Sequence, residues 1–101
     1  MIVRVGKDGA VVRDADDCAR LHLETDLDEA ALRAALKNTG TGELVDAENV
    51  HLDLAVLRSR AALLATTPDW AQQWTAMTGY AKKKGWLSED GRSVQVHVER
   101  G

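Results

Sequence analysis

Three short segments of this chain share one alternation of apolar and polar residues: Leu21-His22-Leu23-Glu24, Val50-His51-Leu52-Asp53 and Val96-His97-Val98-Glu99. Each segment contains a histidine, and together they hold all three histidines of the chain. Side chains two residues apart in a β-strand point to the same side of the sheet. The pattern therefore predicts three strands whose apolar residues face a core and whose histidines and acids share the opposite face.

The length of 101 residues is enough for one domain with one core, so we expect residues 1–101 to form a single domain. The apolar fraction of 45% and the charged fraction of 29% are typical of globular proteins and argue against a disordered chain. Phe is absent, so the bulk of an aromatic core has to come from tryptophan.

Turn and cap residues divide the rest of the chain into elements. Two β-prone runs flank the turn residues Gly6–Gly9, which predicts a hairpin. Asp26 and Glu29 have the spacing of a capping box, which predicts a helix that ends at Gly40. The expected strands are 2–5, 10–13, 19–24, 49–53 and 93–99, and the expected helices are 27–39, 54–65 and 68–84.

Residues 46–65 fit two structures. One is a single long helix that begins at Asp46. The other is a short strand over 49–53, followed by a helix that Asp53 caps. The alternation of Val50, Leu52 and Leu54 favours the strand.

The segment that follows Thr67 predicts a helix with Pro68 in its first turn and Gly85 at its end. Along it, tryptophans and smaller apolar residues recur at i, i+4, i+7 and i+11, a stripe typical of a buried helix face. The stripe consists of Trp70, Trp74, Met77 and Ala81. Trp86 lies just past the helix stop, and we expect it to remain partly exposed.

The order of these elements predicts an α+β fold, a two-layer sandwich with a small antiparallel or mixed sheet. We expect about four to five strands with about three helices packed on one face. The predicted core sets strand residues against helix residues. It consists of Leu21, Leu23, Val50, Leu52, Val94, Val96 and Val98 facing Leu32, Leu36, Leu57, Leu64, Trp70 and Trp74.

The histidine-bearing face is the candidate interaction or ligand surface. It comprises His22, Glu24, His51, Asp53, His97 and Glu99, and Trp86 is a further candidate contact. Three imidazoles can form a zinc site, which makes His22, His51 and His97 candidate metal ligands. The alternative is a polar sheet face with ordinary cross-strand pairs. We favour that alternative, because ligand spacings such as H-E-x-x-H are absent from the sequence, and we expect no metal or other cofactor.

The sequence offers little for catalysis. No serine lies in a nucleophile elbow, and acids flank Cys18, which disfavours its thiolate form. We therefore expect a non-enzymatic protein without catalytic residues.

Charge and composition bear on partners and location. The net charge of −3 argues against nucleic acid as a partner, since phosphate binding needs clustered cations, and Lys82–Lys84 can be explained by the helix dipole. The longest apolar run is far too short to cross a membrane. The single cysteine and the lack of a signal-like N-terminus predict a cytoplasmic location.

The leading functional hypothesis is a small interaction or regulatory domain that binds another protein or a second copy of itself through the open sheet face. The alternative is a metal- or small-ligand-binding protein that uses the same face. A weaker alternative is a winged-helix DNA-binding domain, which requires residues 46–65 to be fully helical.

Overall fold

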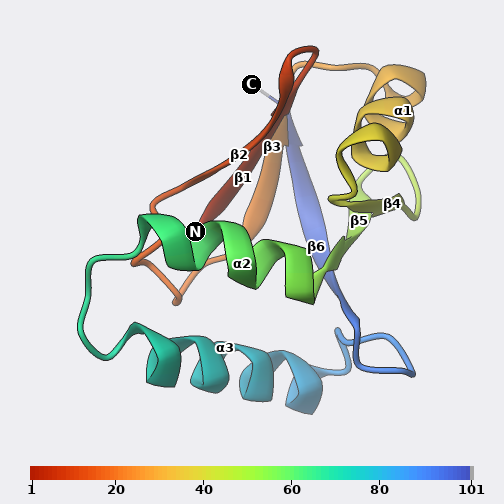
Figure 1. The fold of residues 1–101 in the computed structure, drawn as a ribbon. Helices are drawn as coiled ribbons and strands as arrows, with labels where there is room; N and C mark the ends of the chain where they lie inside the picture. The colour runs from red at the N-terminus through yellow and green to blue at the C-terminus, as the bar shows by residue number, and fades with distance from the viewer. Residues whose placement is uncertain (101) are drawn as a thin grey trace.

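The computed structural model describes residues 1–100 (Figure 1). Its strands are β1 (Ile2–Gly6), β2 (Gly9–Arg13), β3 (His22–Thr25), β4 (Gly42–Leu44), β5 (Asn49–Asp53) and β6 (Ser93–Arg100). Its helices are α1 (Glu29–Thr39), α2 (Leu54–Leu64) and α3 (Trp70–Lys84). The α+β class expected from the sequence is confirmed.

The strands form one mixed sheet in the order β2-β1-β3-β6-β5-β4. The β1–β3 and β3–β6 pairs are parallel, and the β1–β2, β5–β6 and β4–β5 pairs are antiparallel. β6 thus joins a half formed by β2, β1 and β3 to a half formed by β5 and β4. The sheet curls, so that α1 packs against β4 at one edge and against β1 and β2 at the other, and α2 packs against β2 and β5. In Figure 1, α3 lies below α2.

The sheet has six strands, one more than the upper end of the predicted range, and the additional strand is β4. Its three residues lack an alternating apolar pattern, so strand periodicity did not indicate it. Its position depends instead on Gly42, which lies opposite Leu52. A Cβ atom on Gly42 would lie 2.0 Å from the backbone oxygen of His51, so glycine permits this close approach of two strands.

The predicted hairpin is confirmed, with Gly6 opposite Gly9 at its end. β3 begins at His22 rather than at residue 19, because its parallel partner β1 begins at Ile2, which lies opposite His22. The first helix is capped by Asp28 rather than Asp26. The Asp28 carboxylate accepts a hydrogen bond of 2.8 Å from the Ala31 backbone N–H, and Gly40 ends the helix in the left-handed conformation, as predicted.

Residues 46–65 contain a strand followed by a helix, so the alternative of one long helix is wrong. Asp53 caps α2 as expected: its carboxylate accepts a hydrogen bond of 3.0 Å from the Val56 N–H. The winged-helix hypothesis depended on a fully helical segment here, and β5 removes that basis.

Trp70, Trp74 and Ala81 of the α3 stripe are buried, as predicted, whereas Met77 is partly buried. Trp70 and Trp74 are 7% and 6% exposed, their ring centroids lie 5.6 Å apart, and the Trp70 indole N–H donates a 2.7 Å hydrogen bond to the Ala15 carbonyl. The helix begins at Trp70 rather than at Pro68. The preceding turn is held by Asp16, whose carboxylate accepts hydrogen bonds from the backbone N–H groups of Thr66 and Thr67.

Alternate residues of the strands face inward and form one core cluster with the helices. Its strand residues include Val3, Val5, Leu23, Val50, Leu52, Val94, Val96 and Val98, and its helix residues include Leu32, Leu36, Leu57, Ala61, Trp70 and Trp74. The expectation that Leu64 is buried is wrong, since it is 55% exposed. Leu64 ends α2, and beyond it Ala65 packs against the core instead.

Candidate functional site

The outward face of the sheet carries the histidines and acids of the sequence pattern. We call it the polar face and define it by Arg4, His22, Glu24, His51, Gln95, His97 and Glu99. Arg4 lies 3.3 Å from a Glu24 oxygen and 2.5 Å from an Asp26 oxygen. His22 Nε2 lies 3.5 Å from Glu99 Oε2. The polar face thus contains an ion pair between Arg4 and Glu24 and a close cross-strand contact between His22 and Glu99.

The three histidines do not converge on one point within residues 1–100. His97 lies opposite Asn49, whereas His51 lies opposite Gln95, two residues along the same strand pair. His22 belongs to β3, on the other side of β6. Asp53 has a structural role as the cap of α2. Within residues 1–100, no three His, Cys, Asp or Glu side chains lie close enough together to hold a metal ion.

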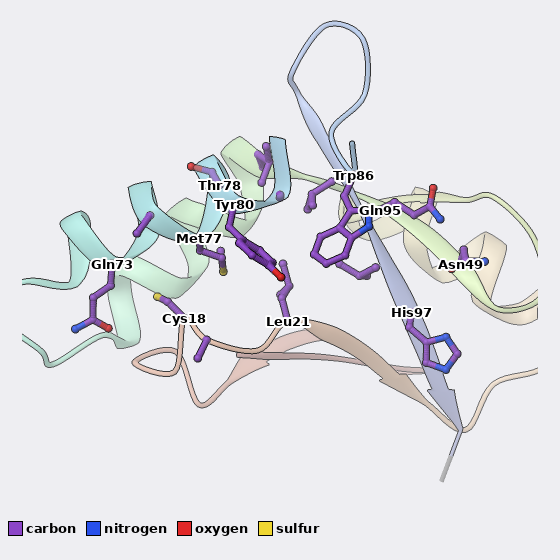
Figure 2. Close-up of a pocket in the computed structure, with 16 residues that line it drawn as sticks. Cys18, Leu21, Asn49, Gln73, Met77, Thr78, Tyr80, Trp86, Gln95 and His97 are labelled. Atoms are coloured by element: carbon purple, nitrogen blue, oxygen red, sulfur yellow. The ribbon is translucent and has the colours of Figure 1, made fainter. Parts of the chain in front are cut away.

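A groove that the sequence did not indicate lies between α3 and the strands (Figure 2). Its volume is about 860 Å³, within the size range of small-molecule sites. Figure 2 shows Tyr80 and Trp86 projecting into it, with Leu21 beneath them and His97 pointing away. We call it the aromatic groove, and its central residues are Leu21, Met77, Tyr80, Trp86, Gln95 and Val96.

The aromatic groove exists because β3 and β6 pair over part of their length. Their ladder runs from Leu23–Val98 to Thr25–Arg100. Near the start of β6, Trp86 and Leu87 cover the side of the strand that pairs with β3 farther along. The Gln95 N–H donates a 2.8 Å hydrogen bond to the Trp86 carbonyl, and Leu87 forms a β-bridge with Val94. Between these two contacts, the edge of β6 at residues 95–97 faces the groove.

Backbone alternation shows which groups this open edge presents. The Val98 N–H donates to Glu48, next to β5, whereas the Gln95 N–H donates to Trp86 on the opposite side. Successive residues of a strand direct their N–H and C=O groups to alternate sides. The Gln95 C=O and the His97 N–H therefore both point to the side of the groove, between the Trp86 contact and the β3 ladder.

The end of α3 positions the two groove aromatics. Gly85 adopts a left-handed conformation with φ of 78°, and the Trp86 N–H donates a 2.9 Å hydrogen bond to the Ala81 carbonyl. This reversal of the chain returns Trp86 to Tyr80, with ring centroids 5.7 Å apart in an edge-to-face arrangement. Tyr80 and Trp86 are 55% and 45% exposed, so the expectation of a partly exposed Trp86 is confirmed.

The lining of the aromatic groove carries no Asp, Glu, Lys or Arg side chain. Its polar groups are neutral amides and hydroxyls, the Cys18 thiol and one imidazole, that of His97. Burial raises the pKa of the Cys18 thiol, which keeps it protonated and weakly nucleophilic. One feature of the sequence relates to this groove: Tyr80 and Trp86 flank the glycine that ends the helix. Their convergence depends on the geometry of the turn at Gly85, which the sequence pattern does not contain.

No protein-family model, curated protein or solved structure matches this chain. None of the helices within residues 1–100 has the length and apolar character needed to cross a membrane.

Proposed function

We propose that this protein is a non-enzymatic binding module and that the aromatic groove is its binding site. The observation that carries the proposal is the pair of exposed aromatic rings, Tyr80 and Trp86, over a concave surface next to an open strand edge. Concave, largely apolar surfaces with a few polar groups are typical of ligand sites.

The chemistry of the lining favours binding over catalysis. General acid–base catalysis needs a group that can accept or donate a proton near the substrate. The lining contains no carboxylate, the His97 ring points away from the groove (Figure 2), and the thiol pKa of Cys18 is raised, which leaves the Tyr80 phenol as the one acid–base side chain that projects into the groove.

The test uses N-phenyl-1-naphthylamine, a neutral aromatic dye that fluoresces in apolar surroundings. We expect the dye to bind with one-to-one stoichiometry and Trp86→Ala to weaken binding about tenfold, the order of an aromatic contact. The matched control is Leu63→Ala, which truncates a side chain that is 87% exposed on α2, outside the groove. An unchanged affinity in the Trp86 variant, or an equal loss in both variants, would contradict the assignment.

A second candidate function is self-association through the polar face, as the sequence suggested. Two observations support it. The polar face carries both signs of charge, with the Arg4 guanidinium beside the Glu24 carboxylate and a further carboxylate at Glu99, so a two-fold-related copy can offer opposite charges to each. It also faces away from the core that the helices cover.

Sedimentation velocity between micromolar and millimolar concentrations tests self-association. We expect a concentration-dependent dimer that salt weakens and that His51→Glu disrupts, because an added carboxylate upsets the charge balance of the face. Leu63→Ala again serves as the control. A monomer at every concentration would remove this candidate.

A further inference from the structure

The aromatic groove also indicates what kind of molecule it accepts, an inference that rests on the proposed binding function. We propose that its ligand is a neutral, planar heteroaromatic compound with adjacent hydrogen-bond donor and acceptor atoms on one edge, as in a cyclic amide. Such a ligand would lie in the groove against Trp86 and form two hydrogen bonds with the edge of β6.

The charge of the ligand follows from the lining. A charged ligand that leaves water needs an opposite charge or several hydrogen bonds as compensation. The groove offers no side chain with a fixed charge, and the nearby Lys84 ammonium lies over the Tyr80 ring, 5.5 Å from its centroid. A neutral ligand avoids this desolvation cost.

The flat shape of the ligand follows from the aromatic pair. Trp86 and Tyr80 meet edge to face, with an angle of 71° between their rings. Each ring thus exposes a different surface, and a planar molecule can stack on the indole while its edge contacts the phenol. Met77 and Leu21 supply apolar contacts below these rings.

The polar edge of the ligand follows from the open strand edge. The Gln95 C=O is an acceptor and the His97 N–H is a donor, and the two lie on the same side of β6 beyond the pairing with β3. Unsatisfied backbone groups gain most from a partner in a partly desolvated site. A cyclic amide presents its N–H and C=O side by side, so it can donate to Gln95 and accept from His97.

Three matched compounds test the inference: 2-quinolinone, its N-methyl derivative, and 2-quinolinone-4-carboxylate. The first has both edge atoms, the second lacks the donor, and the third adds a negative charge. We expect calorimetric affinities in which the parent compound binds about tenfold more tightly than either derivative. Trp86→Ala should weaken the parent compound about tenfold, whereas Leu63→Ala should leave its affinity unchanged.

A second readout reports on the backbone contact directly. In ¹⁵N–¹H correlation spectra, we expect the His97 amide signal to move downfield with 2-quinolinone and to move much less with the N-methyl compound. Equal binding of these two compounds, or an unmoved His97 signal, would overturn the proposed contact with the edge of β6. Tightest binding of the carboxylate would overturn the neutral ligand class.

The design separates this inference from the proposed function. If the naphthylamine dye binds at Trp86 but the three quinolinones fail to discriminate or to bind, the groove remains a binding site and the ligand class is wrong. If the dye also fails to bind, the proposed function is wrong as well.

Discussion

Single residues fix several of the close contacts in this fold, and Gly42 is the clearest case. Its Cα sits against the backbone of β5, where a Cβ atom would overlap the His51 oxygen. Asp16 is a second case, because one carboxylate binds the Thr66 hydroxyl at 2.7 Å and the backbone of the turn before α3. Neither residue belongs to the core, yet Gly42 joins two neighbouring strands and Asp16 joins segments distant in sequence.

Gly42→Ala should destabilise the protein by about 3 kcal/mol, at the upper end of the cost of overpacking, because the added methyl group meets backbone rather than a flexible side chain. The matched control is Gly79→Ala in α3, where a Cβ would meet no atom within 4 Å. That variant should gain up to about 1 kcal/mol from helix propensity. Urea unfolding measures both, and equal stability of the two variants would contradict the close approach of β4 and β5.

Asp16 should make stability depend on acid pH. Hydrogen bonds from Thr66 and Thr67 hold the pKa of its carboxyl well below the ordinary value of 3.8. Because the pKa is lower in the folded state, the stabilisation is complete above the unfolded-state pKa and is lost as the pH falls below it. Between about pH 5 and pH 2, the melting temperature should therefore fall more steeply for the wild type than for Asp16→Asn. Parallel curves would contradict the role of this carboxylate.

At the scale of elements, periodicity and caps located most of the secondary structure. The tryptophan stripe, the hairpin and the Asp53 cap were predictable because each depends on residues near one another in sequence. β4 was not predictable in this way, since its pairing depends on a glycine that faces another strand. The cap of α1 was misplaced by two residues, because Arg4, distant in sequence, engages Asp26.

The candidate site was predictable only in part, because some of its features are local in sequence and others depend on how the strands pair. Alternation correctly placed His22, His51 and His97 on the outer side of the sheet, but their spacing depends on strand order and register, which the pattern does not contain. Prediction of the aromatic groove from sequence needs still more information than the strand order and register. It arises from the partial pairing of β3 with β6 and from the turn at Gly85, and both are tertiary features.

The tryptophan helix should be essential to stability. Trp74→Ala removes a side chain that is 6% exposed and stacked on Trp70, and we expect a loss of about 3–5 kcal/mol. A loss of this size is a large part of the stability of a typical domain. Trp86→Ala, whose side chain is 45% exposed, is the matched control and should cost far less in the same denaturation assay. A Trp74 variant with an unchanged melting temperature would contradict the core assignment.

At the scale of the whole molecule, the net charge argues against nucleic acid as a partner. The chain has a net charge of −3, and its clustered basic residues are Lys82–Lys84 in the last turn of α3. We expect no gel shift with random single- or double-stranded DNA at micromolar protein and about 0.15 M salt, because phosphate binding needs more cationic contacts. Salt-sensitive binding that is lost in the triple variant Lys82→Glu, Lys83→Glu, Lys84→Glu would contradict this expectation.

The central place of β6 has a consequence for how the chain acquires its structure. Its partners β3 and β5 come from earlier parts of the chain, and the Leu23–Val98 contact joins residues far apart in the sequence. Such non-local pairing slows folding, because a large loop has to close before the contacts form. During synthesis, β1–β3 and β4–β5 therefore emerge as separate halves, and the complete sheet has to wait until residues 93–100 have left the ribosome.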